Sequence, residues 1–260
     1  MSFGGEIKMP LACITGAGSG IGREFARQLS RQGCALILVG RDERKLRKTA
    51  GLCGPETEII ICDLSDESAC FRLAADLKKR PVDLLINNAG FGYVGEFVSG
   101  DPENDLAMFH VNAEAVHILT RAVLPRMIRA DKGYILNTAS TAGLLCGGPY
   151  MASYYASKAY VVSLTTSIAA ELRQRGSHVY ISALCPGPVR TGFDARAGVR
   201  RPLPGITPEK CVSYCLSQMK RHKLIIIPGA AVRTGTYLAK LLPRKLQSRV
   251  IAIGQKRKMT

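Results

Sequence analysis

The stretch Thr15-Gly16-Ala17-Gly18-Ser19-Gly20-Ile21-Gly22 follows a short apolar run and precedes a helical pattern that starts near residue 20. Glycine adopts backbone conformations that other residues avoid, so the chain can turn sharply here. The N–H groups at the start of the helix then converge where the helix dipole favours a phosphate. A glycine-rich turn alone is weak evidence, but this strand–turn–helix context favours a site for a dinucleotide. No Lys-Ser/Thr pair closes the stretch, which argues against a P-loop.

Outward from this turn, short apolar runs alternate with longer helical patterns. Seven runs are typical of strands, at residues 11–15, 35–39, 58–61, 82–86, 134–137, 179–184 and 224–227. Helical patterns occur near residues 20–32, 42–50, 66–79, 102–130, 151–175 and 208–221. Uninterrupted apolar runs suit strands covered on both faces, and the alternation implies parallel strands with helical crossovers. We therefore predict one α/β domain over residues 1–260, a doubly wound parallel sheet of the Rossmann type with helices on both faces.

The end of the second predicted strand, Leu38-Val39-Gly40-Arg41, indicates which dinucleotide binds. A carboxylate at this place binds the ribose 2′-hydroxyl of NAD, whereas an arginine accommodates the 2′-phosphate of NADP. Asp42 comes one residue later, where we expect it to cap the next helix. The sequence therefore favours NADP(H), with a solvent-exposed arginine in a loop as the alternative.

Tyr154 and Lys158 lie four residues apart at the start of the pattern at 151–175, so they share one helix face. A phenol has an ordinary pKa of about 10 and is a poor acid/base at neutral pH. A nearby ammonium and an oxidised nicotinamide favour the phenolate and bring the pKa toward a useful range. Such pairs also occur by chance, so this one gains weight only from its surroundings.

Other polar residues lie at or beside predicted strand ends, where doubly wound sheets bind their ligands. Ser140 follows the fifth strand, where its hydroxyl can stabilise an oxyanion, although serine is also a common turn residue there. Asn87-Asn88-Ala89-Gly90 closes the fourth strand, and its small residues allow a flat cofactor to approach. Asn112 lies in a long apolar helical pattern, where an amide without a partner is unfavourable.

Together these strings resemble the motifs of the short-chain dehydrogenase/reductase family, in order from about residue 10 to residue 228. The glycine-rich turn matches TGxxxGxG, Asn87-Asn88-Ala89-Gly90 matches NNAG, and Tyr154 with Lys158 matches YxxxK. Asp63 matches the family's adenine-ring aspartate after the third strand. The string Pro186-Gly187-Pro188-Val189-Arg190-Thr191 matches PGxVxT.

The resemblance implies an oxidoreductase that moves a hydride between a nicotinamide and a carbonyl or alcohol carbon. It implies four catalytic residues: Tyr154 as acid/base, Lys158 on the ribose, Ser140 orienting the carbonyl, and Asn112 holding a water of the proton relay. The residues expected to bind NADP(H) are Gly16, Ser19, Gly20, Ile21, Gly22, Arg41, Asp63, Asn88, Ala89, Gly90, Tyr154, Lys158, Pro186, Gly187, Val189 and Thr191. No metal is expected.

The sequence departs from the family pattern in two places. Ser140 and Tyr154 are fourteen residues apart, where the family usually has thirteen, and we expect the extra residue in the loop at 144–151. Ser19 occupies the place where some NADP-binding members carry a basic residue. The NADP prediction therefore depends on Gly40 and Arg41.

The composition, with 47% hydrophobic and 22% charged residues, is that of a soluble globular chain. The nine cysteines are odd in number and lack zinc-ligand spacing, so we interpret them as thiols of a reducing compartment. The start MSFGGEIKMP lacks a signal-peptide pattern, and no apolar run approaches about 18 residues. We expect a cytoplasmic protein, or one attached at most to a membrane surface.

The formal net charge is +16, and no acidic residue follows Glu209. This one-signed region suggests an anionic partner, unless its cations are only a solvated helix face. A basic helical extension is expected over residues 229–260, broken into two helices at Pro243. Apolar residues recur there at helical spacing: Tyr237, Leu238, Leu241, Leu242, Leu246, Val250 and Ile253. Such helices lie on anionic membranes, or pack on the domain or a second subunit.

Residues 192–208 lie where the family places its substrate lid. They mix apolar residues with Arg196, Arg200 and Arg201, which suits a hydrophobic substrate carrying phosphate or carboxylate, such as an acyl thioester. A mobile solvated loop is the alternative. The carboxyl-terminal extension resembles the branch that includes long-chain 3-ketoacyl thioester reductases and steroid dehydrogenases.

The expected partners are a small carbonyl or alcohol substrate and a second copy of the chain. Helices 102–130 and 151–175 pair subunits in the family, which implies a homodimer or homotetramer. The competing hypothesis is a non-catalytic nucleotide-sensing or nucleic-acid-binding protein that uses the basic extension. That region lacks a recognisable nucleic-acid motif and has few aromatic residues, so we expect no nucleic-acid partner.

Overall fold

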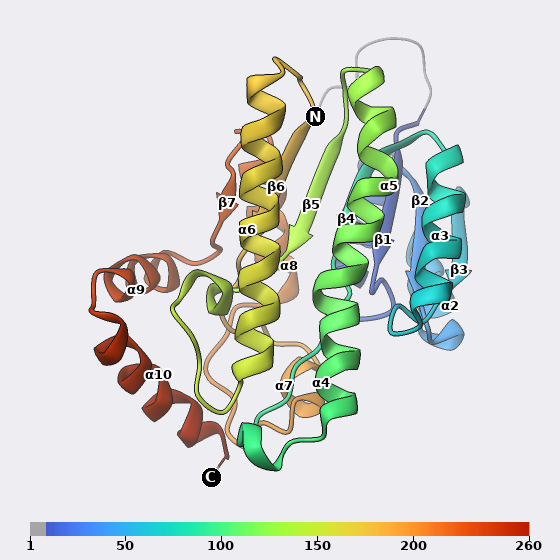
Figure 1. Cartoon of the computed structure of the whole chain (residues 1–260). Coiled ribbons are helices and arrows are strands. Elements are labelled where there is room, and N and C mark those ends of the chain that lie inside the picture. Colours follow the sequence, from blue (N-terminus) through green and yellow to red (C-terminus); the bar gives the residue numbers. More distant parts are fainter. Residues whose placement is uncertain (1–8, 260) are drawn as a thin grey trace.

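The computed structural model describes residues 9–259, and over these residues the chain forms one seven-stranded parallel sheet (Figure 1). The strand order is β3-β2-β1-β4-β5-β6-β7. The strands are β1 (Leu11–Thr15), β2 (Ala35–Gly40), β3 (Thr57–Ile61), β4 (Val82–Asn87), β5 (Tyr134–Thr138), β6 (Tyr180–Leu184) and β7 (Ile225–Ile226). The predicted fold class, a doubly wound sheet of the Rossmann type, is confirmed.

The helices follow the strands in the predicted alternation. They are α1 (Gly20–Arg31), α2 (Glu43–Ala50), α3 (Glu67–Lys79), α4 (Pro102–Phe109), α5 (Ala115–Arg129), α6 (Ala152–Gln174), α7 (Phe193–Arg196), α8 (Pro208–Met219), α9 (Ala230–Lys240) and α10 (Arg244–Met259). Short 3-10 turns lie at η1 (Phe97–Ser99) and η3 (Thr141–Leu144). The predicted break at Pro243 is present, between α9 and α10.

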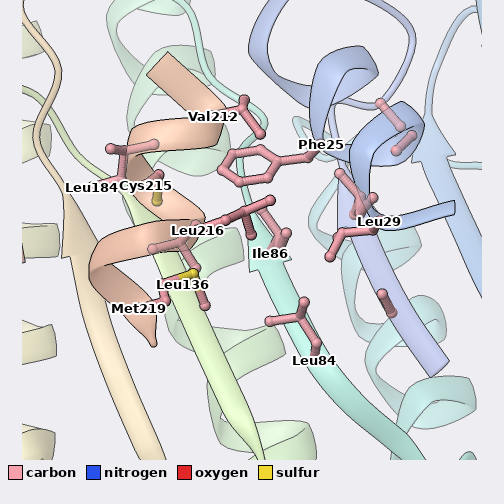
Figure 2. Close-up of a cluster of buried hydrophobic side chains, with 14 of the residues drawn as sticks. Phe25, Leu29, Leu84, Ile86, Leu136, Leu184, Val212, Cys215, Leu216 and Met219 are labelled. Carbon is pink, nitrogen blue, oxygen red and sulfur yellow. The ribbon is translucent and has the colours of Figure 1, made fainter. Parts of the chain in front are cut away.

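Alternate residues of each strand point to opposite faces of the sheet, so two cores form. Figure 2 shows one of them, where Phe25 of α1 lies near Val212 and Leu216 of α8, above Ile86 of β4. The other core holds Leu85 of β4 against α3, α5 and α6. Both faces are therefore covered, which explains why the strands read as uninterrupted apolar runs.

The predicted helix at 102–130 is interrupted where the catalytic candidate Asn112 lies. α4 and α5 are joined by the π turn η2 (His110–Glu114) rather than by continuous α-helix. A π turn holds an extra residue and is often found at functional sites. The apolar pattern did not show this interruption, because the helix continues on both sides of it.

The strand order reverses between β1 and β4, which are neighbours although β2 and β3 come between them in sequence. The glycine-rich turn follows β1, and Asn88 and Gly90 follow β4. Ligands of doubly wound sheets bind at such a switch point, outside the carboxyl ends of the strands. In Figure 1, α4, α7 and α10 gather at this arrowhead end of the sheet.

The carboxyl-terminal extension is helical, as predicted. The side chain of Gln247 in α10 joins it to the chain after β5, since Oε1 accepts from the Cys146 N–H at 2.5 Å. Nε2 of the same side chain donates to the Ala239 carbonyl of α9 at 2.6 Å. Among residues 9–259, none of the helices has the length and apolar character needed to cross a bilayer.

Candidate active site

The glycine-rich turn touches the end of β4 so closely that side chains are excluded. A Cβ added to Gly16, whose φ is 65°, would lie 2.8 Å from the Ala89 Cα. A Cβ on Gly22 would lie 2.3 Å from the Gly16 carbonyl oxygen. Two predicted binding segments therefore meet at main-chain contact distance, which only glycine allows.

Thr15 holds this contact in place, and the sequence prediction had not assigned it a role. Its Oγ1 accepts hydrogen bonds from the N–H groups of Asn88 at 2.9 Å and Ala89 at 3.0 Å. The Asn88 amide returns a bond to the Thr15 carbonyl at 3.1 Å. The available signal was a hydroxyl residue at the last position of an apolar strand.

The start of α1 has N–H groups free for an anion. Arg23 is the first residue of α1 whose N–H bonds back to the turn, to the Ser19 carbonyl at 3.2 Å. The Ser19 side chain makes no capping bond. The N–H groups of Gly20, Ile21 and Gly22 precede Arg23, and such first-turn donors lack an intrahelical acceptor. This arrangement fits a pyrophosphate at the positive end of α1.

Two residues outside the predicted site shape the turn. Arg23 donates to the Gly18 carbonyl at 2.6 Å and to the Thr49 hydroxyl at 3.2 Å. The Thr49 hydroxyl donates to the Ala17 carbonyl at 3.0 Å. The turn is therefore fixed from α1 and α2 before any ligand binds.

The ends of β2 and β3 carry the two predicted adenosine-binding residues. The Arg41 side chain is 71% exposed, and its Nη1 lies 3.7 Å from Oδ2 of Asp63. Burial raises the pKa of Asp63, but hydrogen bonds from Ser65 and the charge of Arg41 outweigh it and leave the pKa below its usual value. Asp42 caps α2 by accepting from the Lys45 N–H at 3.0 Å, as predicted. The guanidinium, rather than Asp42, is thus available at the strand end.

Lys158 is buried beneath the carboxyl ends of β4 and β5. Its ammonium donates to the Thr138 carbonyl at 2.9 Å and lies 5.9 Å from the centroid of the Tyr154 ring. Burial lowers the pKa of Lys158 from 10.5 to about 8. A Cβ on Gly90 would lie 3.1 Å from this ammonium, so the NNAG segment and Lys158 are in contact.

Tyr154 is positioned over Lys158 as the four-residue spacing predicts, but its titration differs from the expectation. Burial raises the pKa of Tyr154 to about 12, and a hydrogen bond with Ser140 opposes this rise. The four-residue spacing predicts instead that the ammonium of Lys158, together with an oxidised nicotinamide, lowers this pKa. Burial is the largest influence on this pKa, and the phenol keeps its proton at neutral pH.

Ser140 and Asn112 are also brought to this site. Ser140 caps the start of η3, where its Oγ accepts from the Ala142 N–H at 3.1 Å. The Asn112 amide donates to the Phe91 carbonyl at 2.8 Å and to Ser157 at 3.1 Å, and its oxygen accepts from the Phe91 N–H at 3.0 Å. The buried amide therefore has the partners that the sequence could not show.

A second set of buried amides, which the prediction missed, joins the strands and helices that carry the site. Asn87 donates to Asn137 at 2.9 Å and to Thr120 at 3.1 Å. Asn137 donates to Thr165 at 2.9 Å. These bonds join β4 and β5 to α5 and α6, so they fix the helix that carries Tyr154 and Lys158.

The predicted nicotinamide-binding turn reaches the glycine-rich turn from β6. A Cβ on Gly20 would lie 3.1 Å from Cγ2 of Thr191. Val189 forms a β-bridge with Ile206, and a Cβ on Gly187 would lie 2.8 Å from Val232 of α9. The PGxVxT-like string therefore lies between the phosphate turn and the carboxyl-terminal helices.

The surroundings of Tyr154 on the loop side are apolar. Tyr154 packs against a cluster that consists of Ala142, Met151 and Tyr155 with Val94, Leu145 and Ile251. The Phe193 ring, in the segment at 192–208, lies 5.6 Å from the Tyr154 ring. This wall comes from four separate segments, and α10 supplies one of them.

The segment at 192–208 is bound to the rest of the domain at several places. The Ala197 carbonyl accepts from the Val94 N–H at 2.9 Å, and the Arg200 N–H donates to the Lys258 carbonyl at 2.8 Å. It begins as the short helix α7 beside Tyr154. The segment at 192–208 therefore has main-chain bonds to two other parts of the domain.

Comparison with known proteins places these features in one family. The family model for short chain dehydrogenases matches residues 10–200. This chain is a member of the short-chain dehydrogenase/reductase family. It is 31% identical over 251 residues to the very-long-chain 3-oxoacyl-CoA reductase-B of Danio rerio, a match that covers 92% of this chain and 78% of the relative. Family membership makes it an oxidoreductase that uses a nicotinamide dinucleotide.

Solved family members superpose on this short-chain dehydrogenase/reductase. The enzyme from Sphingobium yanoikuyae in complex with NADPH has a TM-score of 0.81 and 30% identity, covering 89% of this chain and 92% of that chain. The enzyme from Burkholderia phymatum in complex with NAD has a TM-score of 0.80 and 31% identity, covering 91% and 94%. The neighbours therefore include both cofactors, and the choice between them depends on this chain's own residues.

In this short-chain dehydrogenase/reductase, buried Lys158 predicts a pH-dependent stability. Between about pH 8 and about pH 10 the unfolded chain binds a proton that the folded Lys158 does not. The free energy of unfolding should therefore rise with pH in this window, by up to about 1.4 kcal/mol per unit, relative to Lys158→Met. Urea unfolding of both proteins measures this difference. The same pH dependence in both would contradict a depressed pKa at Lys158.

Proposed function

We propose that the protein is an NADP(H)-dependent reductase of hydrophobic ketones or aldehydes, with Tyr154 as the proton donor. The observation that carries the proposal is the stack of Tyr154 over buried Lys158, between the NNAG segment and an apolar wall. A carbonyl in contact with that wall would lie beside a protonated phenol. For a secondary alcohol the reaction is the reverse, an oxidation at the same residues.

The residues present fit a dinucleotide across the strand ends. Main-chain atoms line the switch point where any Cβ at Gly16 or Gly22 would clash, and the first N–H groups of α1 are free for the pyrophosphate. We assign Gly16, Ser19, Gly20, Ile21 and Gly22 to the phosphates. We assign Asn88, Ala89, Gly90, Pro186, Gly187, Val189 and Thr191 to the nicotinamide half. When bound, the cofactor supplies or accepts the hydride.

The chain's own residues supply the proton and the electrostatics. The phenol of Tyr154, which is protonated at neutral pH, donates its proton to the carbonyl oxygen as negative charge develops there. Ser140, whose hydroxyl opposes the rise in the pKa of the phenol, donates to the same oxygen and orients it. Lys158 provides a buried positive charge that stabilises the phenolate left behind. Asn112, anchored to Phe91, holds the π turn beside Lys158.

Tyr154→Phe is expected to lower kcat for carbonyl reduction by about 10²- to 10⁴-fold, because it removes the proton donor but keeps the ring. Tyr155→Phe is the matched control, since it removes only the hydroxyl that accepts from Gln255. Steady-state turnover with NADPH and a panel of carbonyl compounds measures both. If Tyr154→Phe kept wild-type turnover on every active substrate, the assignment would be wrong.

The preference for NADP(H) is proposed from the end of β2. Gly40 offers no carboxylate to a ribose 2′-hydroxyl, and Asp42 is held in its cap on α2. The exposed guanidinium of Arg41 has Asp63 as a neighbour at 3.7 Å, a weak contact that a phosphate can replace. We assign Arg41 to the 2′-phosphate and Asp63 to the adenine ring.

Arg41→Ala should raise the KM for NADPH by about tenfold to a hundredfold, the worth of a charge-assisted hydrogen bond, and should leave the KM for NADH nearly unchanged. Arg47→Ala is the control, because that side chain is exposed on α2 and paired with Glu43. Equal changes in the two KM values for Arg41→Ala would rule out its role as the 2′-phosphate ligand.

The substrate class is proposed from the wall beside Tyr154. Met151, Leu145, Val94 and Ile251 present hydrophobic side chains, and the lid adds Phe193. These surroundings favour a carbonyl on a long or bulky apolar body, such as a ketoacyl thioester or a steroid-like ketone. The name of the relative from Danio rerio, a very-long-chain 3-oxoacyl-CoA reductase, supports the first of these.

The nine free thiols fit a reducing compartment, so we place the enzyme in the cytoplasm.

The competing function, a non-catalytic nucleotide sensor or nucleic-acid-binding protein, has less support. Family membership and the assembled Asn112, Ser140, Tyr154 and Lys158 both favour catalysis. Salt-dependent binding to DNA or RNA, together with no turnover of any carbonyl, would favour the alternative instead.

We further propose that two copies pair through α4, α5 and α6. A groove of about 410 Å³ runs between α5 and α6, and its lining combines apolar residues (Leu124, Pro125, Ile128, Ile168 and Leu172) with charged ones (Arg121, Glu171 and Arg175). Beyond it, Leu106 and Phe109 of α4 are exposed, and Phe109 meets Tyr160 of α6 edge to face. An apolar face of this kind suits a two-fold, self-complementary interface.

Phe109→Asp should convert a homodimer into a monomer, or a homotetramer into a smaller species, because a charge would be buried in the pair. Phe71→Asp is the control, since Phe71 is similarly exposed but lies on α3. Light scattering after gel filtration gives the masses. A monomeric wild type, or an unchanged mass in Phe109→Asp, would refute this interface.

A further inference from the structure

The outer face of α9 and α10 is unusually apolar for a helix surface. Its exposed large side chains are Tyr237, Leu238, Leu241, Leu246, Val250 and Ile253, each at least 45% exposed. In α10 the last three follow at intervals of four and three residues, so they form one stripe along the helix. We call these six residues the terminal apolar stripe.

The inner face of α10 is held to the domain mainly by buried polar side chains, with Ile251 as its apolar contact, whereas an ordinary surface helix buries an apolar stripe. The buried residues of α10 are two glutamines, Gln247 and Gln255. Gln247 accepts from the Cys146 N–H and donates to the Ala239 carbonyl, while Gln255 donates to the Tyr155 hydroxyl at 2.8 Å. Because these bonds fix the rotation of the helix, the terminal apolar stripe is held outward.

Cations flank the stripe. Lys245, Arg249 and Lys256 are exposed and recur at intervals of four and seven residues, so they form a neighbouring row on α10. No acidic residue follows Glu209 in the whole chain. A second copy of this face would set cations against cations, so self-pairing is disfavoured, whereas an anionic surface is complementary.

We propose that α9 and α10 dock the protein on an anionic lipid surface. The terminal apolar stripe would enter the boundary between headgroups and acyl chains, and the flanking cations would contact lipid phosphates. Leucine, isoleucine and valine suit lipid rather than nucleic acid, which needs aromatic side chains to stack bases, and the stripe has only Tyr237. This binding goes beyond the proposed reaction and does not depend on it.

Docking would bring the reaction site to the lipid. Ile251 of α10 belongs to the apolar wall with Met151 and Tyr155, and the Lys258 carbonyl binds the lid at Arg200. The loops around Tyr154 would therefore lie at the surface where long-chain carbonyl compounds dissolve. This consequence, unlike the docking itself, rests on the proposed function.

Flotation of the full-length protein tests the docking, with vesicles of phosphatidylcholine plus phosphatidylglycerol and vesicles of phosphatidylcholine alone. Wild type should float with the anionic vesicles, bind less as salt rises, and bind neutral vesicles much more weakly. Lys245→Glu/Arg249→Glu should weaken the partition coefficient by about tenfold or more. Lys78→Glu/Lys79→Glu, the same charge change on exposed α3 residues, should bind several-fold better than that variant.

Leu241→Ser/Val250→Ser should also weaken binding by about tenfold or more, since both side chains are exposed and free to enter lipid. Phe71→Ser is its control on α3. Equal binding of all variants, equal binding to neutral vesicles, or binding to RNA but not to vesicles would overturn the proposal. Carbonyl turnover in lipid-free buffer is measured in parallel. If the wild-type protein turned over no carbonyl compound in this buffer, the proposed reaction would be contradicted, and the vesicle result would still decide the docking.

Discussion

The contact between the glycine-rich turn and the end of β4 constrains the rest of the site. The two segments are more than seventy residues apart in sequence, yet the Thr15 hydroxyl holds the N–H groups of Asn88 and Ala89 within 3.0 Å. The strands can come this close because Gly16 has no side chain toward Ala89. The contact brings the amino end of α1 and the segment before Gly90 to one switch point, and Lys158 packs against Gly90 from α6.

Burial determines the protonation of the two groups beside this switch point. Lys158 and Tyr154 both have a pKa displaced toward their neutral forms, to about 8 and about 12 respectively. A neutral phenol is a proton donor rather than a base, which suits reduction of a carbonyl. The buried amides Asn87 and Asn137 tie β4 and β5 to α5 and α6, so the helix carrying the pair is fixed without reference to a ligand.

Much of this arrangement could be predicted from the sequence because its signals are local. Apolar runs located the strands to within a few residues, strand-end positions brought Ser140 and Gly90 to one edge, and the four-residue helical spacing paired Tyr154 with Lys158. The π turn at Asn112 could not be predicted, since it depends on partners in Phe91 and Ser157 that are distant in sequence. The roles of Thr15 and Arg23 were missed for the same reason. The apolar pattern of α10 was visible, but only the bonds of Gln247 and Gln255 show which face is turned outward.

The account's central claim is that a dinucleotide lies across the switch point with its nicotinamide beside Tyr154. A crystal structure of the NADP⁺ complex tests it most directly. The account predicts the pyrophosphate on the N–H groups of Gly20 to Gly22, the 2′-phosphate in hydrogen-bond contact with Arg41, and the nicotinamide facing the phenol. A dinucleotide bound away from the glycine-rich turn, or a nicotinamide separated from Tyr154, would contradict it.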